Sequence, residues 1–111
     1  MKARWLAVSA VAVLLAAGQA NAAIGKDEAL ELAKKSGCLA CHSIEKKVVG
    51  PAWQDVGNKY KGDATMKDKL VAKVKAGGKG VWGEVPMPPY SPRVPDADIE
   101  KLVEFVLSLA K

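Results

Sequence analysis

The sequence predicts a small, mainly helical domain that follows a short N-terminal leader. Several stretches have apolar residues at the spacing of an amphipathic helix, and one shorter stretch begins with proline and ends with glycine, as a single helical turn does. These stretches are residues 23–36, 51–57, 63–76 and 96–110. Residues 77–95 form a loop rich in glycine and proline, and a loop of this length in so small a domain is usually functional.

Residues 1–22 have the features of a secretory signal peptide. Lys2 and Arg4 form a charged start, an apolar run too short to span a bilayer comfortably follows, and residues 20–22 (Ala-Asn-Ala) match a cleavage site. We expect cleavage before Ala23, export to the periplasm and no stable membrane insertion of the product. An uncleaved membrane anchor is the alternative.

Removal of the leader leaves residues 23–111, which are enough for one domain with one small core. The formal charge falls from +5 to +3 because Lys2 and Arg4 are lost. This mildly basic chain lacks the interleaved basic and aromatic residues of a nucleic-acid surface. Since it contains a single phenylalanine, its core is poor in aromatic residues, and a buried cofactor would add the missing apolar surface.

The stretch Cys38-Leu39-Ala40-Cys41-His42 has the spacing of a c-type haem attachment site. Each thiol would add to one of two vinyl groups on adjacent pyrroles, so the cysteines must lie a short, fixed distance apart. The next residue is then held beneath the iron, where an imidazole can bind as the proximal ligand. His42 is the only histidine of the chain, so no other imidazole competes for this role.

Three other interpretations of these five residues are weaker. A thioredoxin-like redox pair would follow a strand, whereas the residues before Cys38 are typical of a helix that ends at Gly37. A disulfide closing so short a loop would remove little entropy from the unfolded chain. A structural zinc site needs about four ligands, and only Cys38, Cys41 and His42 are available as soft or imidazole ligands.

The first helix, residues 23–36, has small apolar residues on one face, including Ala29 and Ala33, and Gly37 is a plausible cap at its C-terminal end. Small residues predict close approach to another helix. The closing helix, residues 96–110, has the strongest apolar stripe, and we expect that stripe to meet the first helix. Asp96 is the expected N-cap.

Pro51 opens the predicted turn of residues 51–57, which Gly57 is expected to end. A carbonyl in the neighbourhood of Pro51 could accept the Nδ1–H of His42 and raise its basicity as a ligand, although a simple turn proline is the plainer interpretation. Trp53 is expected to form part of the cavity wall.

The helix predicted at residues 63–76 has Asp63 or Thr65 as its cap and ends at Gly77-Gly78. One side carries Leu70, Val71 and Val74, and the opposite side carries lysines.

Met87 lies in the long loop between Pro86 and Pro88-Pro89, which restrict the backbone on both sides and would aim its thioether at one point. Most methionines fill cores. Beside a haem without a second imidazole, Met87 becomes the candidate for the sixth iron ligand, because Met66 lies on a predicted helix without such bracing.

Together these residues resemble a known family, the class I cytochromes c, and within it the short bacterial cytochrome c-551 type. The resemblance rests on four motifs and runs over essentially the whole chain after the leader. The motifs are residues 38–42 (Cys-Leu-Ala-Cys-His), 49–52 (Val-Gly-Pro-Ala), 80–83 (Gly-Val-Trp-Gly) and 86–89 (Pro-Met-Pro-Pro).

The resemblance implies an all-α fold of about four helices around one covalently attached haem c, with His42 and Met87 as axial iron ligands and the Pro51 carbonyl bound to His42. It places Trp82 near a haem propionate. Lys73 stands where an arginine is familiar, which would reduce a bidentate contact to a point charge. Tyr90 stands where an asparagine is familiar near the methionine sulfur.

The function that follows is one-electron transport between a donor complex and an acceptor reductase or oxidase, by a monomer that is not an enzyme. With both axial positions filled by protein, the iron has no open position for oxygen or peroxide chemistry. The alternatives are a peroxidase-like enzyme and a fixed subunit of a redox complex. For docking to partners, the candidate residues are Lys46, Lys47, Lys73, Lys75 and Lys79.

Overall fold

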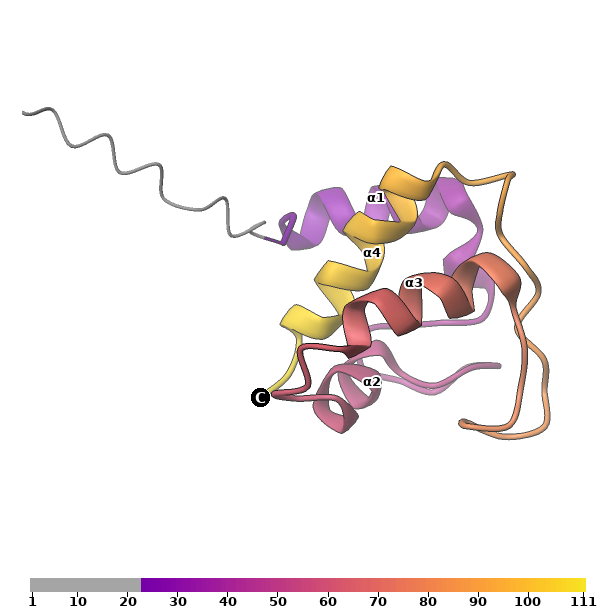
Figure 1. Cartoon of the computed structure of the whole chain (residues 1–111). Coiled ribbons are helices and arrows are strands. Elements are labelled where there is room, and N and C mark those ends of the chain that lie inside the picture. Colours follow the sequence, from indigo (N-terminus) through magenta and orange to yellow (C-terminus); the bar gives the residue numbers. More distant parts are fainter. Residues whose placement is uncertain (1–22) are drawn as a thin grey trace, which may run out of the picture.

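The computed structural model describes residues 23–111, so the predicted leader lies outside the described residues. The order of elements is α1 (Lys26–Ser36), a short 3-10 helix η1 (Cys38–Ala40), α2 (Trp53–Lys59), α3 (Met66–Ala76) and α4 (Asp96–Ser108). Within residues 23–111 there is no strand and no helix long and apolar enough to cross a membrane. The predicted all-α fold is confirmed. Helix α4 contacts α1, α2 and α3 and so organises the domain (Figure 1).

Helix α1 begins three residues later than predicted and ends where predicted. Gly25 precedes it in an extended conformation, and acidic side chains in its first turn and lysines in its last turn both suit the helix dipole. Gly37 has φ 87°, a left-handed conformation that favours glycine, and its N–H is donated to the carbonyls of Ala33 and Lys34.

The prediction for residues 51–57 was wrong at both ends. Pro51 lies outside the helix, Ala52 is the N-cap, and α2 continues past Gly57 to Lys59. Gly57 is buried inside the helix and serves close packing instead: a Cβ there would lie 2.6 Å from the carbonyl oxygen of Val106 on α4. A glycine is therefore needed at the crossing of α2 and α4.

The N-terminal ends of α3 and α4 also differ from the prediction. Helix α3 begins at Met66 rather than at residue 63, and Thr65, one of the two predicted caps, is its N-cap residue, although its side chain makes no capping hydrogen bond. The Asp63 carboxylate accepts hydrogen bonds from the N–H and hydroxyl of Thr65, which lower the pKa of Asp63. Pro95, not Asp96, is the N-cap residue of α4, and Asp96 is already the first helical residue. The Asp96 carboxylate pairs with Lys75 at 3.0 Å.

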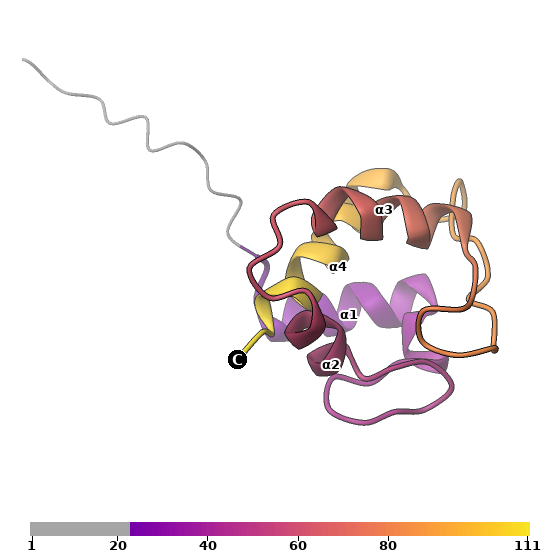
Figure 2. The same cartoon turned by 60° about the horizontal axis from the view of Figure 1, so that its bottom comes forward.

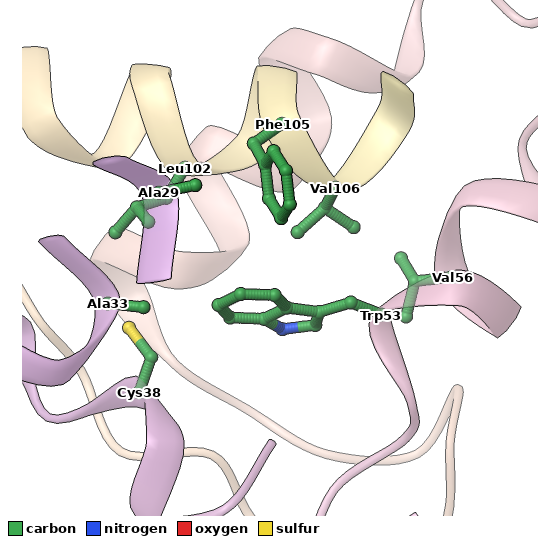
Figure 3. Packing of buried hydrophobic residues seen from close by; sticks show 8 residues of the cluster. All are labelled: Ala29, Ala33, Cys38, Trp53, Val56, Leu102, Phe105 and Val106. Atoms are coloured by element: carbon green, nitrogen blue, oxygen red, sulfur yellow. The ribbon is translucent and has the colours of Figure 1, made fainter. Parts of the chain in front are cut away.

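The main core forms where α4 crosses α1, as the small residues of α1 predicted. Ala29 and Ala33 are fully buried. Their small side chains let α1 approach the apolar stripe of α4, and the Trp53 indole fills the space between the helices and Cys38 (Figure 3). The cluster consists of Ala29, Ala33, Cys38, Trp53, Val56, Leu102, Phe105 and Val106.

A second cluster lies on the other side of α4, toward α3 and the long loop. Its buried members are Tyr90, Val94, Ile99 and Val103. Half-buried residues of α3 and the loop pack against them: Leu70, Val71, Val74 and Met87, with Leu107 of α4. None of the residues of α3 is fully buried, so this helix forms one wall of the domain rather than part of its centre.

The C-terminal end of α4 is held by polar side chains of α2. Gln54 Nε2 donates a hydrogen bond to the carbonyl of Leu109, and the Asn58 side-chain oxygen accepts the N–H of Lys111 at 2.8 Å. The first bond satisfies a carbonyl that the C-terminal end of the helix leaves without an intrahelical partner, and the second binds the residue that lies just beyond that end. The start of α2, which carries Trp53, is thereby tied to the end of the chain.

Candidate cofactor site

A largely apolar cavity of about 260 Å³ lies between α2, α3, α4 and two loops. The loop after Cys41 and the loop after Ala76 lie at the same end of the molecule, in both Figure 1 and Figure 2, and both contribute to the cavity wall. All the residues predicted to bind or surround the haem line this one cavity: Cys38, Cys41, His42, Pro51, Trp53, Lys73, Trp82 and Met87.

The attachment segment is folded into a tight turn. The N–H groups of Cys41 and His42 both bind the carbonyl of Cys38, at 3.1 and 3.0 Å. The two thiols are free; Cys38 is buried and Cys41 is half-buried. Burial raises the pKa of the Cys38 thiol, and nearby Arg93 partly opposes that effect. Within residues 23–111 no three His, Cys, Asp or Glu side chains gather into a metal-binding group.

The imidazole of His42 is held from three sides. Its Nδ1 lies 2.8 Å from the carbonyl oxygen of Pro51, so Nδ1 carries the proton and Nε2 presents a lone pair. The Trp53 ring stacks on it, with centroids 5.9 Å apart. Gly50 lies under the ring so closely that a Cβ there would be 2.6 Å from the imidazole. Such contacts fix ring orientation and raise the basicity of an imidazole ligand.

Met87 belongs to a different segment that lines the same cavity. Its side chain is half-buried and packs on the second cluster. Its backbone pairs with Gly78 through two hydrogen bonds of 2.9 Å. A further turn closes the loop tip, where the N–H of Gly80 binds the carbonyl of Gly83. The long loop therefore has one isolated antiparallel bridge, Gly78 to Met87, at its base.

Trp82 lies on the cavity rim and is held there by two residues that the sequence analysis missed. Its ring meets that of Tyr60 edge-on, with centroids 6.5 Å apart. The ammonium of Lys59 lies 5.6 Å from the Trp82 centroid and 5.8 Å from that of Tyr60. This cation–π group links the end of α2 to the loop. No local pattern indicates it, because residues 59–60 and 82 are distant in the sequence.

Lys73 and Tyr90 also line the cavity. The Lys73 amine lies beside Gly78, at the base of the loop. The side chain of Tyr90 is buried, and the Arg93 guanidinium covers its ring at 4.8 Å. Burial raises the pKa of Tyr90. Arg93, which sequence reasoning missed, shields this side of the site from solvent.

The rim of the cavity is apolar and exposed. Four valines on the two loops are 47–63% exposed: Val48, Val49, Val81 and Val85. Of the predicted docking lysines, Lys46 and Lys47 are exposed beside the first pair of valines. Lys75 and Lys79 already pair with Asp96 and Glu84, at 3.0 and 3.5 Å, so their charges are partly compensated within the chain.

Comparison with known proteins shows which family the chain belongs to. Residues 27–110 match the family described as "Cytochrome c". The chain is 60% identical over 80 residues to "Cytochrome c-551" of Allochromatium vinosum, covering 72% of this chain and 84% of the relative. It is 44% identical to "Cytochrome c-552" of Nitrosomonas europaea over 109 residues, which cover 98% of this chain and 99% of the relative.

Solved structures agree. The crystal structure of wild-type Nitrosomonas europaea cytochrome c552 superposes with a TM-score of 0.68 at 46% identity, covering 72% of this chain and 98% of that one. That of the Class 1 cytochrome MtoD from Sideroxydans lithotrophicus ES-1 superposes with a TM-score of 0.66 at 29% identity, covering 80% and 100%. The chain belongs to the cytochrome c family and, within it, to the class I monohaem type.

The cofactor is accordingly one covalently bound haem c, and the protein is a small electron carrier rather than an enzyme. The residues present fit this group. Two thiols and an imidazole on one segment, and a thioether on another, line a single cavity whose wall is mostly apolar.

Proposed function

We propose that Cys38 and Cys41 attach the haem as thioethers, that His42 and Met87 bind its iron, and that the protein carries electrons in the periplasm. The observation that carries this proposal is the placement of His42 and Met87, 45 residues apart in the sequence, in the wall of the same cavity. When bound, the haem supplies a one-electron couple between ferric and ferrous iron.

The chain's own residues set the conditions for that couple. The Pro51 carbonyl holds the proton on Nδ1 of His42 and leaves Nε2 free to bind metal. A thioether ligand such as Met87 favours the ferrous state relative to a second imidazole, and an apolar wall disfavours the extra positive charge of the ferric state. Both effects raise the reduction potential. A site held this firmly also needs little reorganisation when an electron arrives or leaves.

We also propose that the rim of the cavity is the surface through which the protein docks to its redox partners. The exposed valines would make close contact with a donor or acceptor protein, and Lys46 and Lys47 would orient an acidic partner surface. Lys73 and Trp82 line the cavity and would face the haem propionates. We propose transient docking by a monomer, after a signal peptide of residues 1–22 has been removed. The alternative of a fixed subunit would appear as stable co-purification with a redox complex.

The axial assignment is tested by replacing Met87→Ala in the haem-bearing protein, with Met66→Ala as the matched control. Met66 is the first residue of α3 and does not line the cavity. We expect Met87→Ala to lose the thioether-to-iron absorption band, to have a lower potential and to bind carbon monoxide in the ferrous state. Met66→Ala should keep the band and stay inert to the gas. Retention of the band in Met87→Ala would refute the assignment.

A further inference from the structure

We infer that the C-terminal end of α3 positions Met87 through the main chain, and that Gly77 and Gly78 are the positioning residues. The inference rests on the proposed role of Met87 as an iron ligand. It adds to that role the part of the molecule that determines where the thioether lies.

The segment that carries Met87 makes four backbone hydrogen bonds, two to the last turn of α3 and two to Gly78, just beyond the helix. Gly78 N–H is donated to the Met87 carbonyl and Met87 N–H to the Gly78 carbonyl, both at 2.9 Å. Farther along, Tyr90 N–H binds the carbonyl of Val74 at 3.1 Å and Ser91 N–H binds that of Lys75 at 3.3 Å. The returning arm of the loop therefore runs beside the last turn of the helix, at the end of α3 where the loop begins (Figure 1).

Because of its prolines, the Met87 segment has few backbone N–H groups, and all of them are hydrogen-bonded. Proline has no N–H, so residues 86–92 (Pro-Met-Pro-Pro-Tyr-Ser-Pro) contain only three backbone donors. All three are used: two bind carbonyls of the last turn of α3, and that of Met87 binds Gly78, just after the helix. On the helix side, the carbonyls of Val74 and Lys75 belong to the last turn, where carbonyls lack an intrahelical partner. The segment and the helix end thus satisfy each other, and a shift of either would leave several polar groups unpaired.

Gly77 permits this close approach. Its φ of 73° lies in the left-handed region that side chains disfavour. A Cβ at Gly77 would lie 2.5 Å from the Met87 carbonyl oxygen and 2.8 Å from the Pro89 nitrogen. Both are backbone atoms of the methionine segment, so any side chain at position 77 would push that segment away.

Tyr90 fixes the far end of the Met87 segment with both its side chain and its backbone. Tyr90 is buried in the second cluster with Arg93 over its ring, and its backbone N–H is already bound to α3. The Met87 segment is therefore located by main-chain bonds to α3, and the thioether moves only as far as the helix end allows.

The test compares Gly77→Ala with Gly62→Ala in the haem-bearing protein. Gly62 has a similar φ of 80°, but a Cβ there would meet nothing within 4 Å. Both variants therefore place a Cβ on a residue of positive φ, and only in Gly77→Ala does that Cβ press on the backbone of the Met87 segment. Imidazole added to the ferric protein competes with the thioether for the iron. We expect Gly77→Ala to bind imidazole at least about tenfold more tightly than wild type does. Its thioether-to-iron band should be weaker, and its Met87 amide hydrogen should exchange faster.

Gly62→Ala should leave imidazole affinity, band and exchange unchanged, whatever it does to unfolding. If Gly77→Ala does not fold, Gly78→Ala replaces it, because its Cβ would meet mainly the flexible Lys73 amine while its φ of 139° still strains the bridge. Wild-type imidazole affinity in the folded variant would overturn the inference. Met87→Ala in the same assay separates the two proposals: if it loses the band while the glycine variant behaves as wild type, only the positioning role fails.

Discussion

The indole of Trp53 lies against the imidazole of His42, with ring centroids 5.9 Å apart and planes inclined by 29°. The same indole meets Phe105 of α4 edge-on, with centroids 6.2 Å apart (Figure 3). One side chain thus connects the proposed iron ligand to the helix on which the whole core is built. The orientation of His42 and the stability of the domain are therefore expected to respond to the same substitution.

Replacing Trp53→Ala is expected to lower the free energy of unfolding of the haem-bearing protein by about 3–5 kcal/mol, because a large buried ring is lost from the core. Guanidinium titration followed by far-UV circular dichroism measures this. Trp53→Phe is the control: it keeps an aromatic ring between His42 and Phe105 and should lose less than half as much. Equal losses in the two variants would show that the ring contacts contribute little.

Gly57→Ala tests the crossing of α2 and α4. In most helices this change stabilises by about 0.5–1 kcal/mol. Here the new Cβ would lie 2.6 Å from the Val106 carbonyl oxygen and 3.1 Å from the Ala110 nitrogen. We therefore expect the opposite sign, a loss of about 1–3 kcal/mol, as in overpacked cores. Urea titration of the haem-bearing protein measures this change in the free energy of unfolding. Gly25→Ala, whose Cβ would meet nothing within 4 Å, is the control.

How far the sequence predicted the fold depended on whether local pattern or distant packing decided each feature. The apolar stripe of α4 and the small residues of α1 predicted their contact correctly, because each pattern is contained within one helix. Gly57 was misinterpreted as a helix end. A glycine is needed there because α4 packs closely against it, and no local pattern near residue 57 reveals that contact. The start of α3 was placed too early because Asp63 binds Thr65 ahead of the helix.

The same distinction applies to the site. The thiols and imidazole of residues 38–42 could be predicted, since the attachment chemistry dictates their spacing. Lys59 and Tyr60 could not, because the Trp82 ring that they contact lies more than 20 residues further along the chain. The ion pair of Lys75 with Asp96 was missed for the same reason, because the two lie 21 positions apart in the sequence. The contact of Arg93 with the Tyr90 ring is local, but no helical or strand pattern marks it.

Removal of the attachment chemistry should remove the fold. Cys38→Ser, Cys41→Ser protein is expected to carry no haem that resists acid-acetone extraction. Its far-UV circular dichroism should be that of a largely unfolded chain, because α3 has no fully buried residue and its Leu70 and Val74 face the cavity. Recovery of normal, extraction-resistant protein would contradict the proposed attachment. A helical but haem-free chain would contradict only the dependence of the fold on the cofactor.

Charge at the rim should affect how fast partners meet. Lys46→Glu, Lys47→Glu protein is compared with Lys34→Glu, Lys35→Glu protein, which has the same net charge but is altered on α1, away from the cavity. Exposed pairs contribute only about 0–1 kcal/mol each, but they steer association at low salt. We expect the rim variant alone to transfer electrons severalfold more slowly to an acidic partner at low ionic strength.

Stopped-flow rates across a salt series provide the measurement, and the difference between the two variants should vanish at high salt. Equal rates for both variants at low salt would leave contact through the valines as the main determinant of docking.

The two thiols and the imidazole lie within five consecutive residues, whereas the rest of the cavity wall extends as far as Val106. The proposed covalent step thus involves only a short local segment, whereas enclosure of the ring also requires α2, α3, the long loop and α4. We therefore expect ligation to an open chain to come first, with α4 packing over the haem afterwards. A chain that ends before α4 should still accept the haem covalently, but it could not enclose it.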